Sequence, residues 1–319
     1  MTVGQLDTNL RRFYAGARNK SGESYSKSSL LGFRLSFERY LNALPLNRGL
    51  KLSSDPRFKR WNEILNAQIV RLKRQGKENV TYKPALESED LMKLKTWPAI
   101  ALSNPLALLS NVWFNVVLFF CRRGREGQRQ LEKTSFKFEV DASGRWFVIM
   151  AHDEATKNHP RGVSDVPSSE KLARMYKTPE KNDAYKALKF YMAKLNPQCD
   201  AFFQYPRKNS KWNYHDEVWF DAQPIGDNKL DGMMTIISEE AKLYKMHTNH
   251  SVKATAITLW LNAGVQKRHI MAISGHRSEQ SLLHYNRQPS TSQPCTAPAA
   301  KSFREAWHAT DPNLLLSPP

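Results

Sequence analysis

Apolar residues recur at helical spacing in three segments before residue 84, which predicts three amphipathic helices. In the second segment, with Ser28 and Ser29 as candidate caps, the inward positions are Leu30, Phe33, Phe37, Tyr40 and Leu41. In the third segment they are Phe58, Trp61, Leu65, Ile69 and Leu72. The next stretch, residues 75–88 (QGKENVTYKPALES), is polar and contains Gly and Pro. We therefore expect a linker between a helical domain at residues 1–84 and a second domain at residues 89–287.

The most hydrophobic stretch of the chain is residues 105–121, PLALLSNVWFNVVLFFC. It begins with Pro behind a candidate cap, Asn104, and ends at Cys121, which we expect to be a buried thiol. Polar residues interrupt it at Ser110, Asn111 and Asn115. Because a membrane-spanning helix requires about 20 apolar residues with few interruptions, the stretch predicts a buried core helix and no membrane span.

The period of the apolar pattern then changes from helical to alternating. Phe136, Phe138 and Val140 alternate with polar residues, and Trp146–Met150 forms a second apolar run. The residues between them, Asp141 to Gly144, have turn chemistry, and residues 152–162 predict a further turn. The fold class is therefore predicted to be mainly α with a small antiparallel β-sheet, an α+β arrangement.

Helical signals return near the end of the chain. Asn249 is a candidate cap for a helix over residues 250–263, which Gly264 ends. A shorter helix ends at Ser274 before Gly275, and another runs from Ser278 to about Tyr285. Residues 288–319 are rich in Pro, Ser and Thr, and we expect a disordered tail.

The chain is strongly basic, with 48 Lys and Arg against 30 Asp and Glu, a net charge of +18. Residues 1–84 hold 17 of the basic and 6 of the acidic residues, a net charge of +11. Such a surface attracts polyanions, nucleic acid first and anionic membrane second, although a basic protein without such a partner is the alternative. The candidate DNA-binding residues on the outer helix positions are Arg34, Arg39, Lys59, Arg60, Arg71, Lys73 and Arg74. For any single one of them a solvated helix face is the simpler interpretation.

The three cysteines, Cys121, Cys199 and Cys295, are too scattered for a disulfide framework or a zinc site. Their use suits a reducing compartment. The first residues, MTVGQLDTNLRRFY, have no apolar core of a secretion signal, so we expect an intracellular protein.

The most informative residues form a spaced set near the end of the chain: His250-Ser-Val-Lys253, Gly275-His276 and Tyr285. This set resembles the C-terminal signature of the tyrosine recombinases and phage integrases, which reads His-x-x-Arg, Gly-His and Tyr. Tyr285 lies nine positions after His276, which is the usual spacing in that family. The flanking sequences KATAITLWLNAG and RHIMAISGHRS are also similar to the family.

The resemblance extends upstream and covers most of residues 5–290. Arg123 follows the predicted buried helix and Glu126 comes one turn later, with Arg122 and Arg125 as alternatives for the arginine position. Lys157 lies in the predicted turn AHDEATKNHPRG, where the family has a lysine. The chain resembles the crypton-derived branch of this family in the segments FFCRRGREGQR, DEATKNHPRG, ARMY and SGHRSEQSL. That branch is shared with MYM-type zinc-finger proteins and glutamine-rich relatives.

The resemblance implies a core-binding, SAM-like helical DNA-binding domain at residues 1–84 and a catalytic-like domain at residues 89–287. It implies DNA integration and recombination by strand cleavage and rejoining through a 3′-phosphotyrosyl intermediate, on double-stranded DNA, by multimers on paired sites, in the nucleus. Neither a metal nor another cofactor is required. The resemblance implies that Tyr285 is the nucleophile and that Arg123 is a phosphate clamp. It implies that Lys157 is the general acid and that His250 and His276 assist proton transfer.

The sequence departs from the family at one position, because the arginine of His-x-x-Arg is Lys253 here. Lysine keeps the positive charge but lacks the planar pair of donors that binds a phosphate with two hydrogen bonds. This leaves two main hypotheses: a working recombinase, and a domesticated, catalytically weak fold that binds DNA or chromatin. A scaffold for acidic proteins is a third. Taken alone, Tyr285 could be an ordinary packing residue, Lys157 a solvated turn residue and the arginines near residue 123 a basic helix end.

Overall fold

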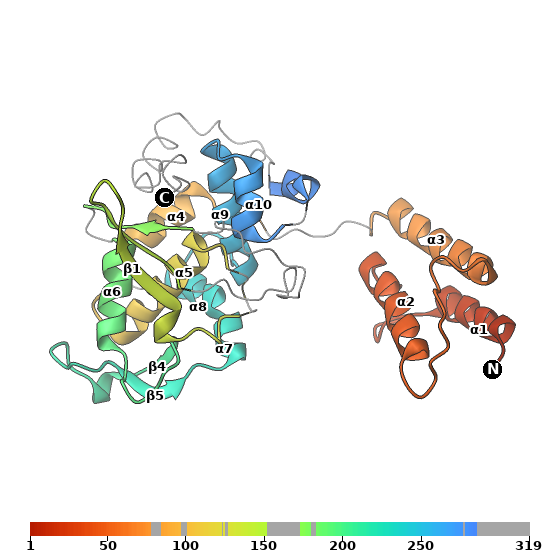
Figure 1. Cartoon of the computed structure of the whole chain (residues 1–319), viewed down its shortest axis with the longest axis horizontal. Helices are drawn as coiled ribbons and strands as arrows, with labels where there is room; N and C mark the ends of the chain where they lie inside the picture. The colour runs from red at the N-terminus through yellow and green to blue at the C-terminus, as the bar shows by residue number, and fades with distance from the viewer. Residues whose placement is uncertain are drawn as a thin grey trace. The chain divides into compact units, whose positions relative to one another are not determined.

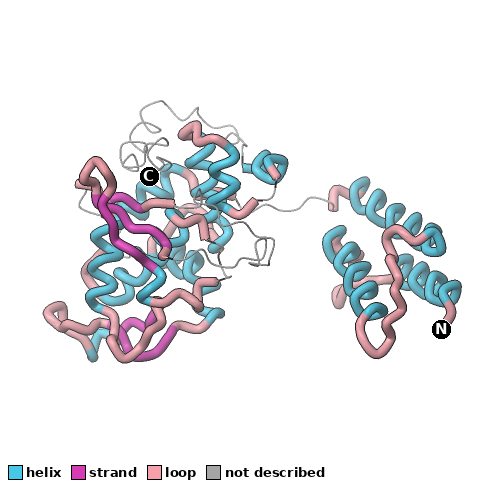
Figure 2. The backbone as a smooth tube through the Cα atoms, in the orientation of Figure 1, coloured by secondary structure: helices cyan, strands magenta, loops and turns pink. Residues whose placement is uncertain are grey.

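A computed structural model of the chain describes residues 1–77, 84–96, 101–122, 124, 127–151, 173–179, 183–276 and 278–285. The chain divides into two compact units, Met1–Thr81 and Tyr82–Pro319, which we call unit 1 and unit 2. Among the described residues helices dominate and the strands form two small antiparallel sheets, both in unit 2 (Figures 1 and 2). The predicted fold class, mainly α with a small antiparallel sheet, is confirmed.

Unit 1 is built from α1 (Val3–Gly16), α2 (Lys27–Asn42), η1 (Pro56–Phe58) and α3 (Lys59–Arg74). The cap of α2 is Ser26, whose side chain accepts a hydrogen bond from the backbone N–H of Ser29 at 3.2 Å. The prediction that Ser28 or Ser29 caps this helix was wrong, because both already lie in its first turn. The hydroxyl that satisfies a free backbone N–H belongs to the residue just outside the helix.

The core of unit 1 collects apolar side chains from all three helices. The buried side chains are Leu6, Leu10, Tyr14, Leu30, Leu41, Leu50, Leu52, Phe58, Trp61, Leu65 and Leu72. The Tyr14 hydroxyl donates a hydrogen bond to the Leu30 carbonyl at 2.9 Å. Burial raises the pKa of Tyr14 to about 12, although the positive charge of Arg34 acts to lower it. Tyr40, predicted to face inward, is 69% exposed. Leu41, the other inward position predicted here, is buried. Consecutive residues on a helix point about 100° apart, so Tyr40 faces away from the core when Leu41 faces it.

Unit 2 contains most of the helices. They are α4 (Ser88–Thr96), α5 (Pro105–Phe119), α6 (Ala184–Lys194), α7 (Asp227–Asp231), α8 (Met233–Glu240), α9 (Asn249–Asn262) and α10 (Lys267–Ser274), with the 3₁₀ turns η3 (Lys133–Ser135), η5 (Asn209–Lys211) and η6 (Glu279–Tyr285).

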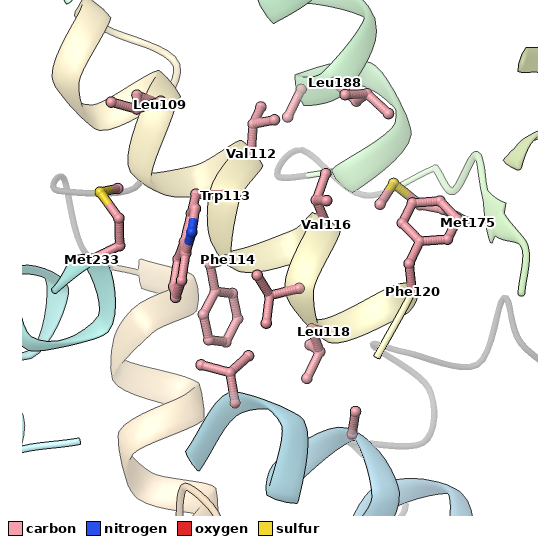
Figure 3. Close-up of a cluster of buried hydrophobic side chains, with 14 of the residues drawn as sticks. Leu109, Val112, Trp113, Phe114, Val116, Leu118, Phe120, Met175, Leu188 and Met233 are labelled. Atoms are coloured by element: carbon pink, nitrogen blue, oxygen red, sulfur yellow. The ribbon is translucent and has the colours of Figure 1, made fainter. Parts of the chain in front are cut away.

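Helix α5 is the centre of the unit 2 core. Asn104 caps it by accepting from the backbone N–H of Ala107 at 2.9 Å, and Pro105 is its first residue, both as predicted. Nearly every residue of α5 is buried, and α6, α8 and α9 pack against it. Figure 3 shows its side chains reaching in all directions, including Val112, Trp113 and Val116. Within the described part of the chain, no helix is long and apolar enough to cross a membrane.

The larger sheet has the antiparallel order β1 (Phe136–Val140), β2 (Trp146–Met150) and β3 (Met175–Tyr176). The two predicted strands are confirmed. Gly144, at a φ of 77°, closes the turn between them by donating its N–H to the Asp141 carbonyl. The smaller sheet pairs β4 (Gln204–Pro206) with β5 (Phe220–Pro224). The turn predicted at residues 152–162 and the tail predicted at residues 288–319 lie outside the described residues.

Candidate active site

The first turn of α9 is fixed by a buried asparagine. Asn249 accepts a hydrogen bond from the Met234 N–H at 2.9 Å and donates to the Gly124 and Leu230 carbonyls, each at 2.7 Å. The residue at the cap position is Thr248, so the prediction that Asn249 caps the helix was wrong. Asn249 is the first helical residue and its side chain is turned into the protein, where it joins three segments of unit 2.

The loop after α5 is held against this turn. Gly124 is buried, and a Cβ atom at this position would lie 2.3 Å from the Asn249 Cβ. Its carbonyl also accepts from Gln128 Nε2 at 2.8 Å, and Gln128 Oε1 accepts from the Trp113 indole N–H at 2.5 Å. The loop is thereby connected to α5 on one side and to α9 on the other.

The predicted clamp Arg123 lies outside the described residues, as do Arg125 and Glu126. Its neighbours in the chain are described: Arg122 donates to the Gly127 carbonyl at 2.7 Å, and Gly124 contacts Asn249. Lys157, the predicted general acid, also lies outside the described residues. The placement of these two basic residues stays a prediction.

The two residues of the His-x-x-Lys motif lie in the first two turns of α9, three residues apart and so on one side of the helix. His250 is exposed, whereas Lys253 is half-buried and donates from Nζ to the Ser274 carbonyl at 2.7 Å. Lys253 also lies near Cys121 at the end of α5. Burial raises the pKa of the Cys121 thiol to about 11, and the positive charge of Lys253 opposes that rise.

The Gly-His pair lies at the end of α10. Gly275 adopts a left-handed conformation with φ of 71°, which ends the helix and turns the chain back. The turn brings His276 Nδ1 to 2.6 Å from the Ser274 hydroxyl oxygen. Ser274 therefore contacts both motifs, Lys253 through its carbonyl and His276 through its hydroxyl.

Tyr285 ends η6 and is half-buried. Its ring packs edge-on against His276, with centroids 5.7 Å apart and an interplanar angle of 75°. The buried side chain of Leu282 anchors η6, and the Tyr285 carbonyl accepts from Thr258 Oγ1 of α9 at 3.5 Å. The structure thus joins Lys253 and His276 through Ser274, and it places the Tyr285 ring against His276.

The predicted DNA-binding residues of unit 1 divide into two groups. Exposed side chains belong to Arg39, Lys59, Arg60, Arg71, Lys73 and Arg74. Arg34 is half-buried, and its Nε is buried with no hydrogen-bond partner among the described residues. The exposed residues of α3 lie on the half of the helix that faces away from Trp61, Leu65 and Leu72.

Sequence reasoning missed the residues that hold the site together, namely Gly124, Gln128, Asn249 in its actual role, and Ser274. Ser274 lies within the motif-flanking sequence RHIMAISGHRS. A serine two residues before His276, with a glycine between them, is the signal that could have indicated a contact between the two side chains. Gln128 and Asn249 gave no comparable signal, because their partners lie far away in the sequence.

The sequence matches no protein-family model, and no curated protein is significantly similar to it. Solved structures that resemble it include tyrosine recombinases and integrases. XerA recombinase is 16% identical, with a TM-score of 0.40 over 95% of this chain and 98% of that chain. XerH site-specific recombinase, bound to palindromic difH substrate in a post-cleavage complex, is 15% identical, with a TM-score of 0.43 over 95% and 76%. A lambda integrase dimer bound to a COC′ core site is 9% identical, with a TM-score of 0.40 over 91% and 89%. At these values the likeness does not extend to function.

Proposed function

We propose that this chain is a DNA-binding protein of the tyrosine-recombinase type, which cleaves and rejoins DNA through a 3′-phosphotyrosyl intermediate. The observation that carries the proposal is the grouping of Tyr285, His276 and Lys253. Lys253 of α9 and His276, which follows α10, both contact Ser274, and Tyr285 of η6 packs against the His276 ring. The motif spacing in the sequence and the net charge of +18 support the same conclusion.

The reaction assigns one task to each residue. The Tyr285 oxygen bonds to phosphorus while the bond from phosphorus to the 5′ oxygen breaks, so the energy of the phosphodiester is kept in the tyrosyl phosphate. Lys157 gives a proton to the leaving 5′ oxygen, and the phenolic proton passes to His250, His276 or water. Arg123 and Lys253 stabilise the negative charge on the non-bridging oxygens. Attack by a 5′ hydroxyl on the tyrosyl phosphate rejoins the strand.

The wider assignment follows the motif resemblance. Unit 1 is then the core-binding domain, with its exposed basic side chains on the phosphates of double-stranded DNA. The chain belongs to the crypton-derived branch, acts in the nucleus as a multimer on paired sites, and needs no metal or other cofactor. Each of these points is part of the proposal.

A covalent-trapping assay tests the proposed chemistry. A nicked suicide duplex is incubated with the protein, and the expected product is a covalent protein–DNA adduct that resists denaturation. Tyr285→Phe removes the attacking oxygen and should abolish the adduct. Tyr244→Phe is the matched control, because Tyr244 is 77% exposed and lies outside the site. Absence of an adduct with the wild-type protein on every duplex tested, or an adduct that survives Tyr285→Phe, contradicts the proposal.

One observation favours a second candidate function, a catalytically weak module that binds DNA or chromatin. The ammonium group of Lys253 gives a hydrogen bond to the Ser274 carbonyl, and a lysine does not offer the fixed pair of donors of an arginine. Phosphate attraction survives this exchange, whereas transition-state stabilisation is reduced. This candidate predicts salt-sensitive binding to duplex DNA without any adduct.

A further inference from the structure

Ser274 is the last residue of α10 and is buried, with 4% of its surface exposed. Two of its polar groups, the backbone carbonyl and the side-chain hydroxyl, each contact a different site residue. The carbonyl accepts from Lys253 Nζ at 2.7 Å, and the hydroxyl oxygen lies 2.6 Å from His276 Nδ1. The left-handed conformation of Gly275 makes the second contact possible, because it turns His276 back towards the residue two positions before it.

The direction of this second hydrogen bond follows from the acceptors around Ser274. A hydroxyl has one hydrogen to donate, and a buried one that donates to nothing costs free energy. His276 Nδ1 is the partner that the described residues offer to this hydroxyl, and burial removes solvent as an alternative. If Nδ1 carried the proton instead, the Ser274 hydrogen would have no acceptor within the described part of the chain.

We propose that Ser274 is a positioning residue of the site: it donates to His276 Nδ1 and so holds the neutral tautomer with its proton on Nε2. The inference rests on the proposed strand-cleavage function. In this tautomer the Nε2 edge of the ring is a hydrogen-bond donor, which suits a phosphate oxygen and cannot accept a proton.

The Ser274 side chain can be altered without touching the Lys253 contact, because that contact uses the backbone carbonyl. Ser274→Ala removes the hydroxyl, and alanine favours a helix more than serine does, so α10 should remain folded. Ser274→Thr keeps a hydroxyl and is the rescue variant. Far-UV circular dichroism and thermal unfolding verify that both variants fold.

Nitrogen NMR of the free protein, labelled with ¹⁵N-histidine, reads the tautomer directly. The chain has 9 histidines, and His276→Gln identifies the signals of His276. We expect an unprotonated Nδ1 and a protonated Nε2 in the wild type. In Ser274→Ala the Nδ1 signal should move to the position of a nitrogen without a hydrogen-bond donor, and Ser274→Thr should restore it. A protonated Nδ1 in the wild type, or an Nδ1 signal that does not move in Ser274→Ala, overturns the inference.

The trapping assay then asks what the hydrogen bond contributes to the reaction. Ser274→Ala should slow adduct formation by about 10- to 100-fold, since a misdirected ring loses a positioned donor. His276→Gln keeps an N–H donor but cannot act as a base, so it should be more active than His276→Ala. Equal loss in these two variants contradicts the donor role. If the wild type forms no adduct, the proposed function fails, while the NMR measurement still decides whether Ser274 donates to His276.

Discussion

The two units use positive charge in opposite ways. In unit 1 the exposed basic side chains of α3 make no hydrogen bond or ion pair with another described residue, and they are Lys59, Arg60, Arg71, Lys73 and Arg74. In unit 2 Lys253 is half-buried and its ammonium donates to a named carbonyl. The first arrangement leaves long, mobile cations for any phosphate within reach, whereas the second fixes one cation at one point.

This contrast teaches what substitutions should do. Charges on α3 act at long range, and removing one should change binding by a small and additive amount. Residues around Ser274 contact one another, so a single change there should have a large and specific effect. Four measurements separate these two behaviours, and their expected effects run from large to small.

Lys253→Arg should have the largest effect. If the proposed chemistry is correct, a planar guanidinium gives the phosphate a pair of donors, and adduct formation should rise by about 10²- to 10³-fold. The trapping assay measures the rate. Lys245→Arg is the matched control, since Lys245 is exposed and pairs with Glu87 away from the site. A rate that Lys253→Arg leaves unchanged, with thermal unfolding also unchanged, would argue that this position does not limit the reaction.

Gly124→Ala should destabilise unit 2. The added Cβ would lie 2.3 Å from the Asn249 Cβ, so the loop or the first turn of α9 must shift, at a cost of about 1–3 kcal/mol. Gly32→Ala is the comparison in unit 1, because Gly32 lies inside α2 with open space around it. Gly32→Ala should raise the free energy of unfolding of unit 1 by roughly 0.4–1 kcal/mol. Urea unfolding followed by circular dichroism measures the stability of both variants. Equal changes in stability would show that Gly124 is no more crowded than Gly32.

The buried thiol of Cys121 should make the folded state less stable at alkaline pH. Its pKa is about 11 in the folded chain against an ordinary value of 9.0, so the folded state holds the thiol proton more tightly than the unfolded state does. The resulting stabilisation is complete below pH 9 and is lost as the pH rises from 9 to 11, roughly 1 kcal/mol of it by pH 10. Urea unfolding at pH 8 and pH 10 measures the loss. Cys121→Ala should reduce this pH dependence, and an unchanged dependence would count against a buried thiol.

Lys73→Gln should have the smallest effect. If Lys73 contacts one phosphate, the slope of log affinity against log salt should fall by about 0.9, and duplex binding should weaken by a few-fold. Fluorescence anisotropy at several salt concentrations gives the slope. Glu63→Gln removes an exposed negative charge from the same helix and should strengthen binding slightly. If both exchanges weaken binding, or neither changes the slope, α3 is not a phosphate-binding surface.

Local signals in the sequence were sufficient for the parts of the fold that depend on neighbours in the chain. The start of α5 at Asn104 and Pro105, the bounds of β1 and β2, and the end of α10 at Gly275 were all predicted. Each depends on residues within a few positions of one another. No prediction was made between residues 183 and 240, where α7 has five residues and β4 pairs with β5 through an irregular register. Short elements of this kind are set by tertiary contacts.

The site shows the same division. The nine-residue interval singled out His276 and Tyr285, whose rings the structure places 5.7 Å apart. Asn249 was read as a cap, because a polar residue before an apolar helical run is the usual cap signal. Its partners, Gly124 and Leu230, are far away in the sequence, and only folding reveals that its amide is needed there.

The attachment of α9 through Asn249 has a mechanical consequence. Since the Gly124 carbonyl receives hydrogen bonds from both Asn249 and Gln128, the backbone at Gly124 and the first turn of α9 are fixed to each other. A displacement of Gly124 is therefore transmitted to the backbone that carries His250. Gly124 and the first turn of α9 are thus expected to move together.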